Sequence, residues 1–467
     1  MRVLPAALLL VPLLAGCAPR LDDVRNVLLV SIDSLRADHL GCYGYARPTS
    51  PTIDRLARGG VRFASASSPT SWTLPAHVTL LTGLRIGTHL VARTSDVAPR
   101  DRELLAETLS AHGFQTIGFY SGPFLHPAYG FERGFDEYVS CQGFEIDQMK
   151  QLASLAKAHS SVTNPMILES FSAWARERAE PPFFAFVHMW DVHSDYTPPD
   201  EYVRMFDADY TGKLNGQRIA TDGFRPFNTS PRDLAHLLAL YDGEIRYTDD
   251  TLGRMLGVLD EVGHLDDTLI VVTADHGDEF LEHGNKGHRK TVYQEVVHVP
   301  LIMWAGRRLP AATIVDTPVT LADVAPTILD VLGIEAPAPF DGRSLVPALR
   351  GEQLPAKPAI SELYVGWKDR PVLTMASIRE NDTKLVLTRA GLWGKRPRQW
   401  VTYDLARDPL EQSPRPVTNQ TLRAGLERHL RVTMQRLTAK PNKKNGRTPE
   451  ALPDDVVDQL KALGYVE

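Results

Sequence analysis

The sequence predicts an α/β fold, in which helices sandwich a mostly parallel sheet and a smaller α+β subdomain follows at the C-terminus. Continuous apolar runs, typical of strands buried on both faces, occur at residues 26–33, 115–120, 183–188 and 268–273. Segments with helical spacing separate these runs, a pattern that indicates a parallel sheet with helices on both faces. Three of the runs lead into acidic residues or histidines, and sites form at such carboxyl ends of strands.

The first sixteen residues have the features of a signal peptide. A positive start is followed by the apolar run 3–14, which is too short to span a bilayer. Residues 14–17, Leu-Ala-Gly-Cys, resemble the lipobox of bacterial lipoproteins, which makes Cys17 the predicted lipidation site. The alternative is a plain secretory signal. We therefore expect an exported lipoprotein of the cell envelope, periplasmic or on the cell surface, anchored to a membrane and with residues 17–25 as a linker.

Composition excludes one class of partner. The formal net charge is −6 and no long basic stripe occurs, so we expect no nucleic-acid partner. The basic cluster at residues 440–447 is typical of a solvated linker. After Cys17 only Cys42 and Cys141 remain. The sequence does not decide whether these two form one disulfide or stay as free thiols.

The main domain is predicted at residues 26–346, and its first strand, 26–33, ends in Asp33. A helix is expected around residues 53–58. Residues 73–83 then run from a hydroxyl and a proline into an apolar helix, with Pro75 in the first turn. Thr73 lies just ahead of this helix. It is either an N-cap or a residue at the positive end of the helix dipole, where an anion is favoured.

The rest of this domain alternates in the same way. A helix ending at Gly113 precedes the strand 115–120, and the strand 183–188 leads to Asp191 and His193. The remaining expected elements are an amphipathic stretch at 233–262, a strand at 268–273 leading to Asp275-His276-Gly277, a strand at 298–304 and a helix at 320–332.

The character of the chain changes near residue 347. Short β-rich pieces at 373–378 and 384–388 are followed by a helix with apolar residues at helical spacing, which defines the predicted C-terminal subdomain at 347–438. Residues 439–467 are predicted as a linker and a tail helix that packs back on the body.

These motifs resemble the sulfatases and their relatives in the alkaline-phosphatase superfamily. The pieces occur in the family's order, at 26–33, 41–44, 73–83, 273–277 and 298–301, with 403–405, 408–409 and 411–412 resembling its C-terminal subdomain. The resemblance implies one divalent metal ion, with Asp33, Asp275 and His276 as ligands and Thr73 as the nucleophile on or beside it. Calcium or manganese is expected and zinc fits the ligand set. A metal would also activate the otherwise weak threonine nucleophile.

The chain departs from the sulfatase pattern at several positions. Sulfatases carry Cys or Ser at the position of Thr73 and Arg at that of His77, which allows conversion to formylglycine; none is expected here. Ser34 replaces a second Asp, a Lys-x-His pair near 118–124 is missing, and His276 stands where many sulfatases have Asn. The Thr nucleophile and the Asp-His pair look like those of phosphodiesterases and of phosphoglycerol or phosphoethanolamine transferases of the same superfamily.

Further site residues are implied by position. His193 matches the family's leaving-group histidine, a general acid. His288 and Arg289 fall where sulfatases have a substrate-binding Lys, and an arginine suits a tetrahedral oxyanion. His77, one turn beyond Thr73, either assists it or packs. The candidates are catalytic Thr73, His77, His193 and His288; substrate-binding Asp191 and Arg289; and metal-binding Asp33, Thr73, Asp275 and His276.

The sequence therefore predicts a metal-dependent hydrolase of sulfate or phosphate esters, acting on a sulfated or phosphorylated small molecule or glycan. In-line attack by Thr73 would give a covalent adduct. Two alternatives stay open, a phosphoglycerol- or phosphoethanolamine-type transferase acting on an envelope glycan and a non-catalytic binding lipoprotein. One metal is preferred over two, although Asp191, His193 and His288 offer further ligands.

Overall fold

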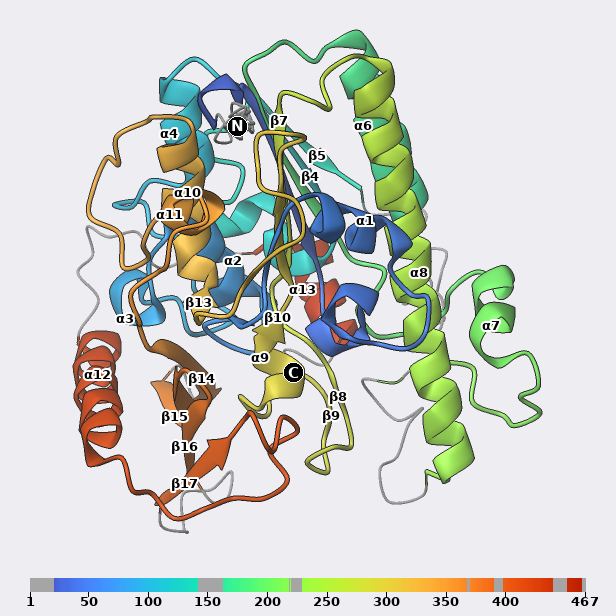
Figure 1. Ribbon diagram of the computed structural model, residues 1–467. Helices are drawn as coiled ribbons and strands as arrows, with labels where there is room; N and C mark the ends of the chain where they lie inside the picture. Colours follow the sequence, from blue (N-terminus) through green and yellow to red (C-terminus); the bar gives the residue numbers. More distant parts are fainter. Residues whose placement is uncertain are drawn as a thin grey trace, which may run out of the picture.

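The computed structural model describes residues 21–141, 163–217, 219, 229–367, 370–389, 398–439 and 452–463 (Figure 1). A large central sheet is covered by helices on both faces, and a smaller antiparallel sheet with its own helix lies at one end of the molecule. This arrangement confirms the predicted fold class. The predicted signal peptide, Cys17 and the basic cluster at 440–447 lie outside the described residues.

The central sheet has eight strands in the order β12-β2-β11-β7-β1-β6-β4-β5. Their bounds are β1 (Asn26–Ile32), β2 (Val61–Phe63), β4 (Gln115–Tyr120), β5 (Glu137–Ser140), β6 (Phe183–Met189), β7 (Thr268–Ala274), β11 (Leu301–Trp304) and β12 (Thr313–Val315). The central strands β1, β6 and β7 are buried along their whole length, which explains their predominantly apolar sequences. Only β11 runs antiparallel to its neighbours in this sheet.

Two expected elements differ in detail. The strand expected at 298–304 divides at Pro300 into β10 (His298–Val299) and β11, because proline cannot donate to a strand ladder. β10 joins β3 (Ala66–Ser67) and β13 (Val319–Thr320) in a separate three-stranded sheet. The helix expected at 320–332 begins with the 3₁₀ turn η7 (Leu321–Asp323) before α10 (Val324–Val331).

Helices cover the two faces of the central sheet (Figure 1). One face carries α1 (Pro51–Gly59), α6 (Asn164–Glu177) and the long α8 (Pro231–Glu261), and the other carries α2 (Thr73–Thr82), α4 (Leu105–Ala111), α10 and α11 (Val346–Leu349). The remaining short elements are α3 (Ile86–His89), α7 (Asp200–Asp207), α9 (Gln294–Val297), β8 (Glu279–Phe280) and β9 (Lys286–Gly287), with 3₁₀ turns at η1 (Leu21–Asp23), η2 (Ala37–His39), η3 (Gly41–Tyr43), η4 (Pro123–Leu125) and η5 (Pro127–Tyr129).

The C-terminal part forms a four-stranded antiparallel sheet covered by one helix. The strands are β14 (Ala359–Trp367), β15 (Arg370–Glu380), β16 (Thr383–Arg389) and β17 (Arg398–Asp404), and α12 (Gln420–Thr438) packs on them with its own apolar cluster. The last helix, α13 (Asp454–Ala462), returns to the main body. Val456 and Leu460 are fully buried in the main core, as the sequence predicted for the tail.

Cys42 and Cys141 are free thiols, so the open question of a disulfide is answered in favour of two unpaired cysteines. Burial raises the pKa of both thiols to about 12. Within the described part of the chain, no helix combines the length and the apolar character needed to cross a membrane.

Candidate active site

The register of the central strands brings two predicted ligands together. β1 pairs in parallel with β7, and Ile32 lies opposite Ala274. The next residue on each strand is a carboxylate, Asp33 on one and Asp275 on the other, and both are fully buried. The donor atoms of Asp33, Asp275 and His276 all lie within 4.8 Å of one another. The site therefore lies at the carboxyl edge of the sheet, as the strand endings predicted.

Helix α2 presents Thr73 to this cluster. Thr73 is the first helical residue, and its side chain does not cap the helix. Its hydroxyl lies 3.4 Å from Asp33 Oδ2 and 3.3 Å from His276 Nε2. The helix is buried throughout and ends at Gly83, whose left-handed conformation (φ 65°) lets the chain turn away. Thr73 thus occupies the helix N-terminus among the predicted ligands, and the N-cap alternative is wrong.

The two carboxylates and His276 offer the donor atoms that a metal ion needs. Asp275 Oδ1 accepts hydrogen bonds from the backbone N–H groups of Ser34 (3.2 Å) and His276 (2.9 Å), whereas Asp275 Oδ2 is buried without a hydrogen-bond partner among the described residues. Burial raises the pKa of both Asp33 and Asp275, and the charge of Asp33 raises that of Asp275 further. Two buried neighbouring carboxylates with an unsatisfied oxygen fit a divalent metal ion.

His276 is oriented for metal binding by its own backbone. Its Nδ1–H donates to the Gly277 carbonyl (3.0 Å), so that Nε2 faces the cluster, 3.3 Å from Asp275 Oδ2. Burial opposes protonation of this ring, but the charges of Asp275, Asp33 and Asp278 together with the hydrogen bond to Gly277 outweigh it and raise the pKa of His276. A bound cation in place of the proton would satisfy the same two carboxylates.

The turn after β1 is held in an uncommon conformation. Ser34 adopts a φ of 56°, a region that L-residues seldom occupy. The Tyr241 hydroxyl donates to the Ser34 carbonyl (2.7 Å), and the Ser34 hydroxyl donates to Asp33 Oδ1 (2.9 Å). Ser34, which replaces the family's second Asp, therefore orients Asp33.

Two further histidines, His193 and His288, lie beside the cluster. The ring centroid of His288 lies 4.4 Å from that of His276 and 5.0 Å from that of His193. His193 stacks on Trp190 (3.9 Å between centroids) and contacts the Ser194 carbonyl through Nδ1 (2.6 Å). Burial, together with the nearby His288, keeps the pKa of His193 well below its ordinary value.

The predicted substrate-binding arginine lies directly against the residues that precede Thr73. The Arg289 guanidinium stacks over Trp72, 4.5 Å from its ring centroid, and the Arg289 N–H donates to the Ser71 carbonyl (3.0 Å). A cavity of about 340 Å³ opens here, with five basic side chains in its lining: His193, Ser194, Ile219, Lys286, Gly287, His288, Arg289, Lys290, Val365 and Leu463. The last two come from β14 and from the end of α13, so the C-terminal part also shapes the site.

The structure does not bring Asp191 into this site. Its oxygens accept from the Thr163 N–H (2.7 Å), the Thr163 hydroxyl (2.6 Å) and the Asn164 N–H (3.1 Å), which anchors the start of α6. Burial raises the pKa of Asp191 to about 6, and these hydrogen bonds oppose the shift. The predicted substrate-binding role of Asp191 is therefore corrected to an anchoring one, because both carboxylate oxygens are engaged elsewhere.

His77 lies beneath Thr73 and does not contact its hydroxyl. Its Nδ1 lies 2.9 Å from the Thr73 carbonyl and its Nε2 lies 2.9 Å from the Ser31 hydroxyl. Burial and His188 lower the pKa of His77 to about 3, which keeps the ring neutral. Both ring nitrogens are thus engaged in holding the first turn of α2. This arrangement fits packing support better than direct assistance.

Sequence reasoning missed two residues of the site. His188 lies inside β6 with its Nε2 3.3 Å from Asp33 Oδ2, and neither ring nitrogen has a hydrogen-bond partner among the described residues. Asp278 contacts His288 Nδ1 (2.7 Å). The available signals were a histidine in an otherwise apolar strand and a second acidic residue three positions after Asp275.

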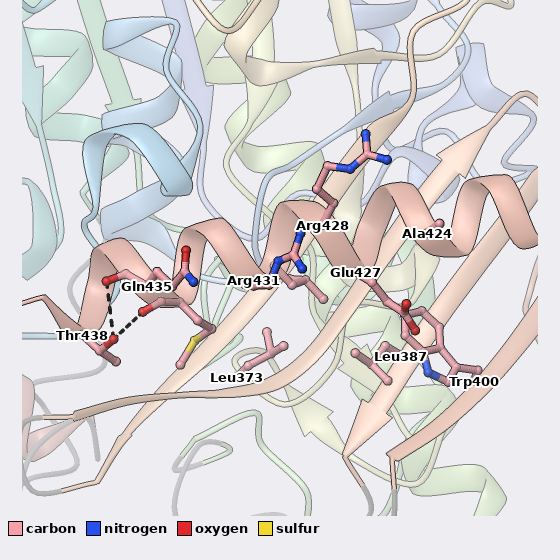
Figure 2. A pocket seen from close by; sticks show the side chains of 11 residues that line it. Leu373, Leu387, Trp400, Ala424, Glu427, Arg428, Arg431, Gln435 and Thr438 are labelled. Atoms are coloured by element: carbon pink, nitrogen blue, oxygen red, sulfur yellow. Dashed lines mark hydrogen bonds between the residues drawn. The ribbon is translucent and has the colours of Figure 1, made fainter.

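A larger hollow, of about 810 Å³, lies elsewhere. It runs between α12 and the strands of the C-terminal sheet, lined by residues such as Leu373, Trp400 and Arg431 (Figure 2). None of the predicted site residues lines it. Three of them, His193, His288 and Arg289, line the smaller cavity instead.

Comparisons with known proteins agree with this geometry. Residues 25–334 match the family model described as Sulfatase, and residues 282–440 match that of the N-sulphoglucosamine sulphohydrolase C-terminal region. The chain is 27% identical to human arylsulfatase A over 377 residues, covering 73% of this chain and 71% of that protein. It is 26% identical to the multifunctional alkaline phosphatase superfamily protein PehA of Trinickia caryophylli over 400 residues (70% and 77% covered). The solved phosphonate monoester hydrolase of Agrobacterium radiobacter has the same fold, with a TM-score of 0.71, 24% identity and coverage of 88% and 96%.

Proposed function

This chain belongs to the sulfatase family of the alkaline-phosphatase superfamily and is an ester hydrolase, and on that premise we propose that it cleaves sulfate or phosphate esters by metal-dependent attack from Thr73. One observation carries the proposal. The Thr73 hydroxyl, at the N-terminus of α2, lies 3.4 Å from Asp33 and 3.3 Å from His276 inside the buried acidic cluster. A hydroxyl beside a cation site and a helix N-terminus is placed to attack an anionic ester.

The cation would be held by Asp33, Asp275 and His276 with Thr73 beside it, and it would supply charge neutralisation and nucleophile activation. The Thr73 hydroxyl, which donates toward Asp33 Oδ2, would lose its proton as Oγ forms a bond to the sulfur or phosphorus atom and the bond from that atom to the leaving alcohol breaks. Arg289, stacked on Trp72, binds the non-bridging oxygens. His193, in the lining of the cavity, would take up a proton beside the bound anion, and as the imidazolium it would deliver that proton from Nε2 to the departing oxygen. Water would then attack the central atom, the bond from that atom to Thr73 Oγ would break, and Oγ would take up a proton released by the water.

The substrate is proposed to be a sulfated or phosphorylated small molecule or glycan. The cavity lining carries five basic side chains and no carboxylate among the described residues, which suits an anionic substrate. Arylsulfatase A and the phosphonate monoester hydrolase are hydrolases by name, so the transferase and binding-protein alternatives are not favoured.

The test compares wild type with Thr73→Ala and Thr73→Ser on aryl sulfates, aryl phosphate monoesters and diesters, and aryl phosphonates, each with Ca²⁺, Mn²⁺ and Zn²⁺. Thr73→Ala is expected to lower turnover by about 10³-fold or more, whereas Thr73→Ser keeps a hydroxyl and retains measurable turnover. Mass spectrometry of acid-quenched enzyme is expected to find the sulfuryl or phosphoryl adduct on the peptide containing Thr73. Full activity of Thr73→Ala would exclude this nucleophile.

We also propose that the protein is exported and anchored by a lipid on Cys17, since the apolar run 3–14 leads directly into Leu-Ala-Gly-Cys. Export would place the hydrolase in the cell envelope. Metabolic labelling with a radioactive fatty acid tests this: the wild-type protein should carry label and Cys17→Ala should not. Equal labelling of both would exclude Cys17.

A further inference from the structure

Among the described residues, three aliphatic side chains line the cavity beside the candidate active site, and the roles proposed above use none of them. They are Ile219, from the segment after α7, Val365, from β14, and Leu463, from the turn that ends α13. The same lining holds His193, the proposed acid for the leaving alcohol, and Arg289, the proposed anion-binding group. The cavity therefore combines apolar side chains with the basic ones that the proposed reaction uses.

The face of α13 that docks on the main body continues into this cavity. Val456 and Leu460, four residues apart, are fully buried in the main core, and Leu463 follows Leu460 by three residues, so all three lie on one face of the helix. α13 packs against η4, and the Phe124 ring of η4 packs edge-on against Trp72, with 5.5 Å between centroids. The tail helix is thus attached to the segment that leads into α2.

Val365 faces the main body because of its position in β14. Side chains alternate along a strand, and Leu363 lies in the main core whereas Tyr364 lies in the separate apolar cluster with α12. Val365, the next residue, returns to the side of Leu363 and lines the cavity. The C-terminal sheet therefore contributes a side chain to the site through its first strand.

Ile219 is almost completely buried, and two hydrogen bonds hold its backbone. Its N–H donates to Asp195 Oδ1 (2.6 Å), and its carbonyl accepts from Lys286 Nζ (2.5 Å). Asp195 lies two residues after His193, and Lys286 lies in β9. Ile219 is thus tied to the loop of the proposed acid and to the β8–β9 hairpin.

The two kinds of lining suit the two parts of an ester. The basic side chains attract the sulfate or phosphate group, whereas the aliphatic side chains gain free energy when an apolar surface covers them. Sugar hydroxyls placed against aliphatic side chains would lose hydrogen bonds to water without replacement, which costs free energy. The volume of about 340 Å³ lies near the lower end of the range for small-molecule sites, so it suits a small alcohol.

We propose that Ile219, Val365 and Leu463 determine specificity for the alcohol part of the ester, and that esters of small apolar alcohols are preferred over esters of sugars. This inference rests on the proposed function, because it places the anionic group at Arg289 and the departing oxygen at His193. It narrows the substrate class given above. The C-terminal part of the chain then acts in the choice of substrate and not in the chemistry.

The experiment compares two alcohols of similar size and basicity. Cyclohexylmethanol and the 6-hydroxyl of glucose are both primary alcohols on a six-membered ring, so their esters differ chiefly in the polarity of the ring. The sulfate and the phosphate of each alcohol are offered to the wild-type chain with the metals named above, and kcat and KM are measured separately. We expect the wild type to favour the cyclohexylmethyl ester at least about 10-fold in kcat/KM.

Variants of the lining test which residues cause this preference. Leu463→Ala and Val365→Thr are each expected to reduce it about 10-fold, mainly through a higher KM for the cyclohexylmethyl ester. Val457→Ala is the matched control, because Val457 lies on the same helix but outside the cavity lining, and it should leave the preference unchanged. Titration calorimetry of the four esters with Thr73→Ala, which needs no turnover, is expected to give the same order of affinities.

The outcomes separate this inference from the proposed function. A wild type that treats both alcohols alike or favours glucose, or a preference unchanged in both Leu463→Ala and Val365→Thr, would overturn the specificity role and leave the hydrolase intact. If no ester is cleaved, the proposed function fails, and calorimetry decides: equal or undetectable binding of all four esters would overturn the inference as well. If circular dichroism shows that Leu463→Ala does not fold, the result for Val365→Thr decides.

Discussion

Removal of the His77 ring tests whether this residue supports the nucleophile or acts in the chemistry. The ring lies beneath the first turn of α2 and links the Thr73 carbonyl to the Ser31 hydroxyl, with 2.9 Å on each side. It is fully buried between the aromatic rings of Phe131 and Phe186. His77→Ala therefore removes two hydrogen bonds and opens a cavity directly below Thr73.

The size of the effect follows from these contacts. An unsatisfied Ser31 hydroxyl in the core costs about 1–3 kcal/mol. Loss of a buried ring adds a cavity term of about 2–4 kcal/mol, which gives a total near 3–5 kcal/mol because the two terms overlap. The double variant Ser31→Ala/His77→Leu removes both polar partners and refills the space, so it should lie within about 1.5 kcal/mol of wild type.

Urea unfolding followed by circular dichroism, with turnover of an aryl ester measured in parallel, provides the assay. His112 serves as the control, since it makes the same contact with a carbonyl four residues back (Nδ1 to Thr108 O, 2.8 Å) but is exposed; His112→Ala should cost less than about 1 kcal/mol. A cost below 1 kcal/mol for His77→Ala would refute the packing argument. A stable but inactive Ser31→Ala/His77→Leu variant would show instead that the ring acts in catalysis.

Three further predictions concern other parts of the molecule. Arg289→Lys keeps the charge but loses the stack on Trp72 and the paired donors, so KM should rise about 10-fold with a smaller change in kcat; an unchanged KM contradicts substrate binding by Arg289. His193→Gln should slow esters of alkyl alcohols about 100-fold but 4-nitrophenyl esters far less, because only a basic leaving group needs the proton; equal losses would exclude a general acid. Lys384→Met leaves the buried Glu411 carboxylate, 3.0 Å from the ammonium in the wild type, without its ion-pair partner. The unfolding free energy in the same urea assay should therefore fall by about 3–5 kcal/mol. An unchanged midpoint would show that the ion pair does not contribute to stability.

The sequence shows which segments form the central buried strands, but not the order in which these strands lie in the sheet. β1, β6 and β7 have predominantly apolar sequences because both faces are covered, and that pattern is visible without a structure. β2 has only three residues, and no periodicity distinguishes so short a strand from a loop. The antiparallel direction of β11 depends on the connection that leads to it, which composition does not encode.

The same limit applies inside the site. Asp33 and Asp191 both follow buried strands, so the rule that sites form at strand ends selects both. Only Asp33 faces the cluster, because the Asp191 side chain is turned toward the N-terminal backbone of α6. Asp278 and His288 are ten residues apart, and they meet only because β8 and β9 form a hairpin. Such pairings follow from tertiary contacts and leave no periodic signal in the sequence.

Threonine at the position of the nucleophile constrains the second half of the reaction. A hydrated formylglycine has two hydroxyls, one of which can expel the transferred group, whereas Thr73, the proposed nucleophile, has one oxygen and would form a simple ester. Release of that ester needs water to attack the sulfur or phosphorus atom from the side opposite Thr73. His193 and His288, which line the 340 Å³ cavity, are the basic groups near the site that could accept a proton from this water. Breakdown of the adduct, and not its formation, is then the step that the surroundings of Thr73 must accelerate. With a good leaving group, we therefore expect an initial burst of released alcohol.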